Sequence, residues 1–154
     1  MAETKSERKV AVILATDVVG YSSMMEENED QTLKNLKACR NIIDGFVKEH
    51  HGRIFNTAGD SFLAEFPSAV EAVICASEFQ NTITERNNSV SEEEQMQFRV
   101  GINFGDVVIE DDNLYGEGVN IAARLEALAQ PGGVCLSKNV HEIVNKKTDF
   151  QFHD

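Results

Sequence analysis

Apolar and polar positions follow one another in short blocks that predict alternating strands and helices. The β-branched, apolar run at residues 10–15 predicts a buried strand. Apolar side chains at residues 30–50 recur at helical spacing, and Gly52 follows them as a helix-ending residue, so we expect a helix there. Two strands, at residues 53–55 and 61–66, are expected next, joined by the turn NTAGD.

The second half of the chain continues this alternation. A Pro-Ser pair opens a second predicted helix, which extends to about residue 86. The pattern then predicts two strands paired around Phe104 and Gly105, with Asp106 in the turn of that hairpin. The expected elements are strands 98–103 and 106–110, a helix 116–129, a strand 134–136, a helix 138–144 and a last strand at 149–153.

The order β-α-β-β-α-β, followed by a further strand and helix, predicts an α+β fold of the ferredoxin-like type. With 154 residues, the chain suits one domain, which we place at residues 9–154 after a polar tail at residues 1–8. In this arrangement the first and third strands are commonly neighbours in the middle of the sheet, and one face of the sheet stays open to a partner.

Charge and composition exclude several classes of function. The formal net charge is −12, which argues against binding of nucleic acid through a basic face. An anionic ligand would therefore need divalent cations and a few local basic groups. No apolar run is long enough to cross a membrane, and the first residues lack a signal-peptide core, so we expect a cytoplasmic protein. Three cysteines without metal-ligand spacing are expected in the core.

Two aspartates are candidate metal ligands. Asp17 follows the first predicted strand, and Asp60 lies in the turn before the third. Because neighbouring strands would bring both to one end of the sheet, their carboxylates would repel one another unless cations lay between them. A pair of Mg²⁺ or Mn²⁺ ions would meet that need and hold a triphosphate. The alternative is that both residues only shape turns or cap helices.

Four segments carry a resemblance to a known family. They are "ILATDVVGYS", "NTAGDSFLAEFPSAVEAV", "FRVGINFGDV" and "NLYGEGVNIAARLEALAQPGGVCLS". In this order they resemble the class III nucleotide cyclases, the adenylyl and guanylyl cyclase catalytic domains, over residues 9–154. The resemblance implies a head-to-tail homodimer with active sites between the subunits. It also implies cyclisation of ATP, or of GTP, with release of pyrophosphate.

The resemblance also implies roles for individual residues. Asp17 and Asp60 match the two metal-binding aspartates, and Asn120 and Arg124 match the ribose-orienting amide and the transition-state cation donated by the other subunit. Asn120 and Arg124 are four residues apart, so they share one helix face. The turn after the first strand could offer backbone N–H groups to phosphate oxygens. These groups belong to Val18, Val19, Gly20, Tyr21 and Ser22.

The chain departs from the family at the positions that select the base. Adenylyl cyclases carry a lysine and an aspartate where this chain has Asn56 and Asn113. Amides can face adenine or guanine, so ATP is expected from the family alone, and Asp112 could substitute after a small shift. A phosphate-contacting lysine and its strand, found in relatives after the last strand, are expected to lie beyond residue 154. The alternative is a degenerate cyclase-like module that binds nucleotide or dimerises to regulate a fused domain.

Overall fold

The structure is a computed structural model, which describes residues 7–148 and 152. Strands and helices alternate along the chain, with a short 3₁₀ turn at Glu92–Glu94 before the longest strand. The strands are β1 Glu7–Val18, β2 Arg53–Ala58, β3 Ser61–Phe66, β4 Phe98–Glu110, β5 Asn113–Tyr115 and β6 Val134–Leu136. The helices are α1 Tyr21–Glu27, α2 Glu29–Glu49, α3 Ala69–Asn88, α4 Glu117–Leu128 and α5 Lys138–Asn145.

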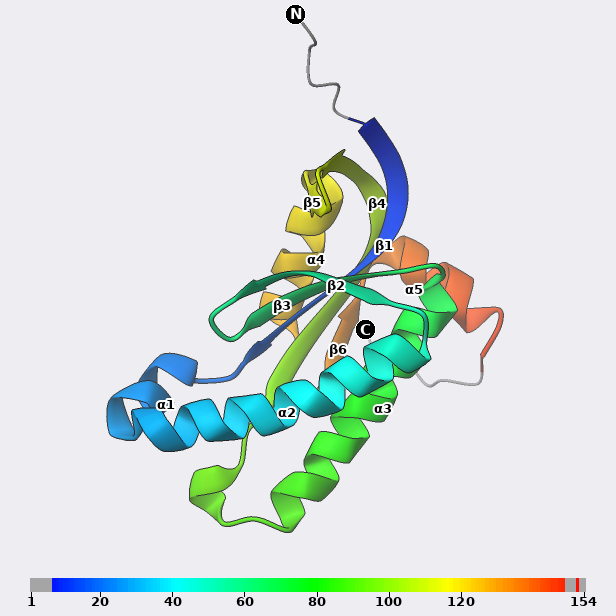
Figure 1. Cartoon of the computed structure of the whole chain (residues 1–154). Coiled ribbons are helices and arrows are strands. Elements are labelled where there is room, and N and C mark those ends of the chain that lie inside the picture. The colour runs from blue at the N-terminus through cyan, green and yellow to red at the C-terminus, as the bar shows by residue number, and fades with distance from the viewer. Residues whose placement is uncertain (1–6, 149–151, 153–154) are drawn as a thin grey trace, which may run out of the picture.

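The strands form one mixed sheet in the order β2-β3-β1-β4-β5, with β6 parallel to β4. The predicted α+β architecture is confirmed, and β1 and β3 are antiparallel neighbours as expected. Helices α2 and α3 pack on one face of the sheet, whereas α4 lies on the other, so that face is not fully open (Figure 1). Strand β1 is therefore buried on both faces.

Alternation along β1 assigns its side chains to two cores. Val12 and Leu14 join the core beneath α2 and α3, whereas Ile13 and Ala15 join the smaller core beneath α4. Side chains two residues apart point to the same face of a strand. Asp17 therefore continues the row that faces α4.

The predicted hairpin around Phe104 and Gly105 is wrong. Residues 98–110 form one continuous strand, and Gly105 pairs with Ala11 in the middle of it. Asp106 consequently lies in the ladder opposite Val10 rather than in a turn. A glycine in the sequence indicated a turn, but here the strand continues through it, and a methyl group added at Gly105 would lie 3.1 Å from the side-chain nitrogen of Asn103.

Other elements also differ from the prediction, and one predicted strand stays untested. Strand β2 extends to Ala58, so Asn56 lies in a strand rather than in a loop. Helix α1 was not predicted, since its short segment lacks an apolar stripe of its own and no residue in it is fully buried. The last predicted strand, at residues 149–153, lies largely outside the described residues.

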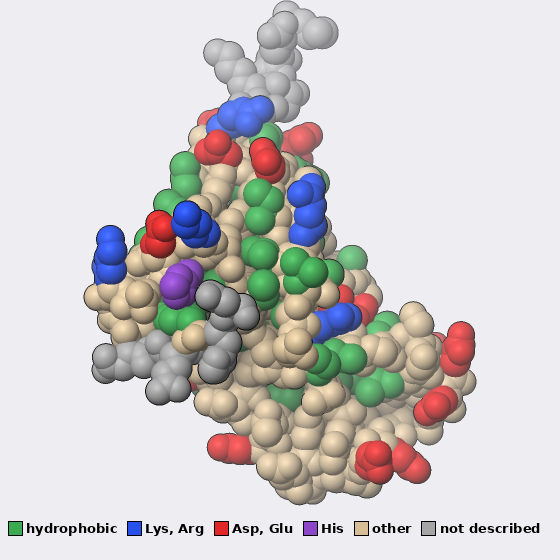
Figure 2. Space-filling view, turned by 180° about the vertical axis from the view of Figure 1, so that it is seen from behind, with side chains coloured by type: hydrophobic (Ala, Val, Ile, Leu, Met, Phe, Trp, Pro, Cys, Tyr) green, Lys and Arg blue, Asp and Glu red, His purple; other side chains and the backbone are tan. Residues whose placement is uncertain are grey.

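The surface reflects the acidic composition. Acidic side chains gather on the lobe that contains α1 and the start of α2, while hydrophobic side chains form a band through the middle of the rear face (Figure 2). Cys39 and Cys75 are buried, Cys135 is half-buried, and all three are free thiols, as expected. None of the helices in the described part of the chain is long and apolar enough to cross a bilayer.

Helix α4 lies unusually close to β4 because of Gly101. A methyl group added at Gly101 would lie 2.2 Å from the backbone nitrogen of Glu126 and 2.3 Å from the carbonyl oxygen of Ala122. Both atoms belong to the helix backbone, which cannot rotate away as a side chain can. The sheet and α4 are therefore in direct backbone contact.

We predict that Gly101→Ala destabilises the fold by about 1–3 kcal/mol, because the helix must shift to admit the methyl group. The matched control is Gly45→Ala on the exposed side of α2, where an added methyl meets nothing within 4 Å. That change should stabilise by roughly 0.5–1 kcal/mol, the usual gain from alanine over glycine within a helix. Urea unfolding of both variants tests the pair, and equal effects would contradict the prediction.

Candidate active site

Asp17 and Asp60 meet at the end of β1. Asp17 is the penultimate residue of that strand, and Asp60 follows Gly59 in the tight turn between β2 and β3. Gly59 has a φ of 59°, a left-handed conformation that suits glycine in such a turn. The backbone N–H of Val18 donates to Asp60 Oδ2 at 3.1 Å. The predicted convergence of the two aspartates is thus present in the structure.

Arg99 approaches Asp17 without pairing fully with it. The two residues are cross-strand partners on β4 and β1, and Arg99 Nε lies 4.0 Å from Asp17 Oδ1. That separation is too long for a hydrogen bond. Both atoms are buried and have no hydrogen-bond partner among the described residues. Buried polar atoms in this state are rare and call for a partner that the chain itself does not supply.

Glu126 brings a third acid to this place, and the sequence analysis did not identify it. Its side chain, on the inner face of α4, is only 7% exposed and lies close to the carboxyl group of Asp17. Burial and the interaction with the neighbouring Asp17 carboxyl group raise the pKa of Glu126 to about 8, although Arg99 opposes the shift. Helical spacing could have indicated it, because Glu126 lies four residues after the buried Ala122.

This donor set fits divalent cations. Carboxylate oxygens are the ligands that Mg²⁺ and Mn²⁺ prefer, and Asp17 Oδ1 lacks a partner although it is buried. Asp17 and Asp60 also lie close enough to Glu126 for their negative charges to raise its pKa. A cation here would relieve the crowding of negative charge and satisfy the orphaned oxygen.

The expected phosphate-binding turn is only partly available. The N–H of Val18 is bonded to Asp60, and the N–H of Val19 donates to the carbonyl oxygen of Gln97 at 2.8 Å. Gly20, Tyr21 and Ser22 begin α1, where N–H groups have no partner within the helix. Two of the five predicted backbone donors are therefore engaged within the chain, and a phosphate-binding role for the other three stays a prediction.

Asn120 and Arg124 lie on the outer face of α4. Both are exposed, whereas Ala122 and Glu126 on the same helix are buried. Arg124 makes no ion pair with any residue that the structure describes. The predicted helix-face pair is thus present, but it points away from the aspartates of its own chain.

The two positions expected to select the base lie on segments that Arg53 joins. Asn56 is half-buried in β2, and Asn113 begins β5. Arg53 Nη1 donates to the carbonyl oxygen of Asp112 at 2.7 Å, which connects the two segments. The Asn113 side chain donates to Tyr115 Oη and accepts from the N–H of Leu114, which leaves one N–H and one oxygen lone pair of the amide for another partner.

Comparisons with known proteins define the class. The family model "Adenylate and Guanylate cyclase catalytic domain" matches residues 2–154. The chain belongs to this family of nucleotide cyclase catalytic domains, which confirms the resemblance found in the sequence.

Individual relatives agree with that assignment. A Rhizobium meliloti (strain 1021) protein, whose name assigns it provisionally as adenylate cyclase 3, is 45% identical across the whole chain. The chain spans only 26% of that protein's length. An adenylate/guanylate cyclase/hydrolase from Silicibacter pomeroyi has a TM-score of 0.90 at 41% identity, covering 97% of this chain and 88% of that one. The guanylyl cyclase Cya2 has a TM-score of 0.81 at 26% identity, covering 92% and 81%.

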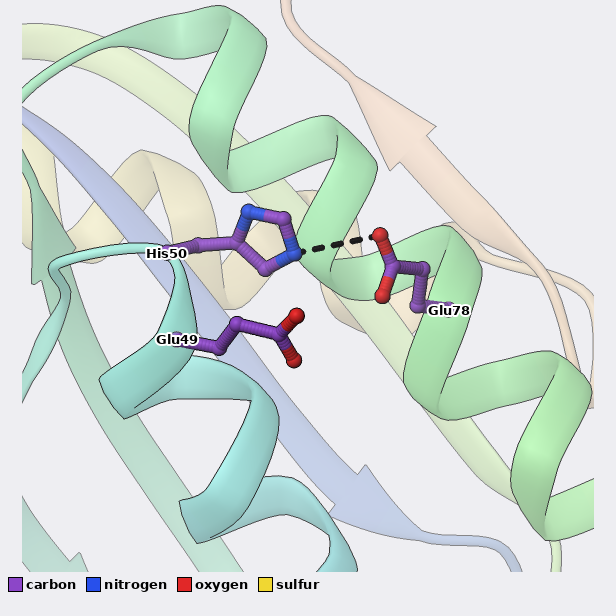
Figure 3. A group of neighbouring side chains, drawn as sticks. All are labelled: Glu49, His50 and Glu78. Atoms are coloured by element: carbon purple, nitrogen blue, oxygen red, sulfur yellow. Dashed lines mark hydrogen bonds and ion pairs between the residues drawn. The ribbon is translucent and has the colours of Figure 1, made fainter.

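A second group of possible metal ligands lies elsewhere, between α2 and α3. Ligand atoms of Glu49, His50 and Glu78 lie within 4.8 Å of one another (Figure 3). His50 Nδ1 is 2.7 Å from Glu71 Oε2, and its Nε2 is 3.2 Å from Glu78 Oε1. A protonated imidazole satisfies both contacts, so this group is explained as an ion-pair clamp between two helices. It lies at the end of α2 that is far from α1 (Figure 1).

We predict that the clamp makes stability depend on pH. Burial disfavours the charged imidazole, but the hydrogen bond to Glu71 and the negative charges of Glu78 and Glu71 outweigh it and raise the pKa of His50 above its ordinary 6.5. A raised pKa means that the clamp stabilises fully below pH 6.5 and loses its effect as pH rises through the folded-state value.

The measurement is urea unfolding of wild type and His50→Gln in buffers from mildly acidic to alkaline pH. The difference between them should be largest in mildly acidic buffer and should shrink in alkaline buffer. His51→Gln is the control, since His51 is exposed and lacks these contacts in the described structure. A difference that grows with pH would contradict the prediction.

Proposed function

We propose that the chain is a nucleotide cyclase that converts ATP to 3′,5′-cyclic AMP and pyrophosphate at a site shared by two copies. The observation that carries this proposal is that the two halves of the predicted site lie on opposite sides of α4. Asn120 and Arg124 point outward, while Asp17 and Asp60 of the same chain lie on the inner side of that helix. A head-to-tail homodimer would unite the two halves, because each copy could present its outer helix face to the aspartates of the other.

In the proposed reaction the ribose 3′-oxygen attacks the α-phosphorus and pyrophosphate leaves. Asp17 and Asp60 would hold two Mg²⁺ or Mn²⁺ ions. When bound, such ions lower the pKa of a coordinated hydroxyl group and neutralise phosphate charge. The Asn120 amide would orient the ribose, and the Arg124 guanidinium would stabilise charge that develops on the α-phosphate. Positioning and charge would therefore account for the rate, with no covalent enzyme intermediate.

The test uses two inactive variants that complement each other. Asp17→Ala and Arg124→Ala should each abolish cyclic nucleotide formation in the presence of Mn²⁺. In an equimolar mixture, half of the dimers would be mixed and would contain one intact site. Activity should therefore return to about a quarter of the wild-type level. Cyclic AMP and pyrophosphate are both quantified, with Glu117→Ala as a control on the exposed start of α4.

Two outcomes would argue against this proposal. Failure of the mixture to recover activity, with both variants folded and dimeric, would contradict the shared site. Mn²⁺-dependent nucleotide binding without turnover in wild type would favour the alternative, a regulatory cyclase-like module. The amides at Asn56 and Asn113 are the observation that keeps this alternative in view.

Base selection is a separate part of the proposal. Similarity to a protein named as an adenylate cyclase supports ATP as the substrate of this chain. Similarity to the guanylyl cyclase Cya2 supports GTP as the second candidate. Asn56 and Asn113 would each offer neutral hydrogen bonds to the base, which are weaker than those of charged groups. We expect modest discrimination between the two nucleotides.

We predict that the double variant Asn56→Lys, Asn113→Asp raises the ratio of kcat/KM for ATP over GTP by roughly tenfold. A hydrogen bond to a charged group contributes about 1 kcal/mol more than a neutral one, which corresponds to a change of this order. Asp112→Asn serves as the control, because it should leave the ratio unchanged if residue 113 faces the base. A ratio that responds only to Asp112→Asn would assign the role to that residue instead.

A further inference from the structure

Arg53 connects two strands that lie at opposite ends of the strand order. In the sequence β2-β3-β1-β4-β5, β2 and β5 are the end strands. Figure 1 shows β2 and β3 running across β1, and this twist of the sheet brings β2 into contact with β5. There Arg53 Nη1 donates to the carbonyl oxygen of Asp112 at 2.7 Å. Among the residues that the structure describes, no other hydrogen bond joins β2 to the β4–β5 hairpin.

The guanidinium of Arg53 is held from its other side by Glu65 of β3. Arg53 Nε and Nη2 both donate to Glu65 Oε1, at 3.0 and 2.7 Å. The second carboxylate oxygen, Glu65 Oε2, accepts from Lys9 Nζ at 2.9 Å. Because Glu65 engages two of the three guanidinium nitrogens, the third is the one that faces Asp112. The rigid, planar fork of arginine serves both partners at once, which a lysine ammonium cannot do.

A β-bulge places Arg53 on the same face of β2 as Asn56. In a regular strand, residues three apart point to opposite faces. Here the pairing register shifts between Ile54 and Asn56. Arg53 consequently lies opposite Glu65, and Asn56 lies opposite Leu63, two residues away on the same face of β3. Since cross-strand partners share a face, the bulge puts the guanidinium beside one of the two residues proposed to face the base.

The carbonyl group that Arg53 binds lies in the turn that carries the other of these residues. Glu110 and Asn113 pair across the β4–β5 hairpin, so Asp111 and Asp112 alone form its turn. Strand β5 has only three residues and pairs with β4 on one side. The place of Asn113 relative to β2 therefore depends on a short hairpin and on the hydrogen bond from Arg53.

Stability alone is a weak explanation for this network. The side chain of Arg53 is 46% exposed, and that of Glu65 is 18% exposed. Ion pairs near the surface contribute little to the free energy of unfolding, because water screens the charges and two long side chains lose freedom. Three hydrogen bonds from one guanidinium nevertheless fix a direction, and the direction leads from β2 to the β4–β5 turn.

We propose that Arg53 is a positioning residue for base selection, which holds Asn113 of the β4–β5 hairpin in a fixed place relative to Asn56 of β2. The inference rests on the proposed function, because it requires both amides to face the base. Arg53 acts through the hairpin backbone rather than by touching the nucleotide. Without its hydrogen bond the hairpin would move away from β2, and a base would keep one amide contact instead of two.

The first experiment measures amide hydrogen exchange of β5 without nucleotide, so it does not depend on turnover. Arg53→Met removes the guanidinium, and Arg53→Lys keeps a positive charge beside Glu65 but loses the fork. Both variants should exchange about 2- to 10-fold faster in β5 than wild type, as expected for the loss of one hydrogen bond. Lys9→Met is the matched control, because it removes the other cation of Glu65 and leaves the bond to Asp112 intact.

The second experiment measures kcat and KM for ATP and for GTP with Mn²⁺. In Arg53→Lys, KM should rise about 2- to 10-fold for both nucleotides while kcat stays near the wild-type value, since a contact to the base is made equally before and during reaction. Introduced into the double variant Asn56→Lys, Asn113→Asp, the same change should remove most of the increase in ATP preference. An arginine with only a structural role would leave the preference unchanged.

Three results would overturn the inference and leave the shared site of the proposed function standing. Unchanged exchange of β5 in Arg53→Lys would show that the bond does not hold the hairpin. Faster exchange with an unchanged KM and an unchanged nucleotide preference would show that the hairpin does not position a base contact. A lower kcat at unchanged KM would assign Arg53 to a different step.

Two further cases separate folding and the proposed function from the inference. If Arg53→Met fails to fold, Arg53→Lys carries both experiments, because it retains the charge that Glu65 needs. Wild type that converts neither nucleotide would refute the proposed function, and the inference on base selection with it, whatever the exchange of β5 shows.

Discussion

The arrangement of the molecule depends on the crowding of carboxyl groups at the end of one buried strand. Residues 11–15 of β1 pack against cores on both faces of the sheet, and the Asp17 side chain that follows them is half-buried. Asp17 is held there beside Asp60 and Glu126, and the cost appears as a pKa of about 8 for Glu126. A chain with a net charge of −12 gains nothing in stability from such a cluster by itself. A bound cation would offset the repulsion between these carboxyl groups, which makes the cluster a candidate metal site.

The close contact between α4 and the sheet fixes where the two faces of this helix point. Glycine at position 101 lets the two backbones touch, which puts Glu126 within reach of Asp17. The same contact fixes the direction of the outer face, where Asn120 and Arg124 are exposed. Under the proposed function, a single chain holds both halves of the site facing in opposite directions, and symmetry between two copies is the simplest way to bring them together.

Carboxyl groups gather both around His50 and at the end of β1, but the charge balance of the two places differs. Near His50 the carboxylates surround a group that becomes cationic, and both ring nitrogens have partners. Near Asp17 the guanidinium of Arg99 stays too far for a hydrogen bond, and both facing atoms have no hydrogen-bond partner in the part of the chain described. Local charge balance thus separates a structural clamp from a candidate metal centre, although both contain metal-binding residue types.

The sequence by itself indicated most of the strands and helices, the pairing of β1 with β3 and the family, because hydrophobic periodicity and ordered motifs are local signals, but it missed α1 and β5. It also indicated Asp17 and Asp60, since each follows a recognisable strand or turn. Only the tertiary structure decided that residues 98–110 form one strand and that Glu126 joins the aspartates. The physical reason is the same in both cases. A glycine or an acid in a sequence has several local meanings, and the backbone of a helix packed across the strand selects one of them.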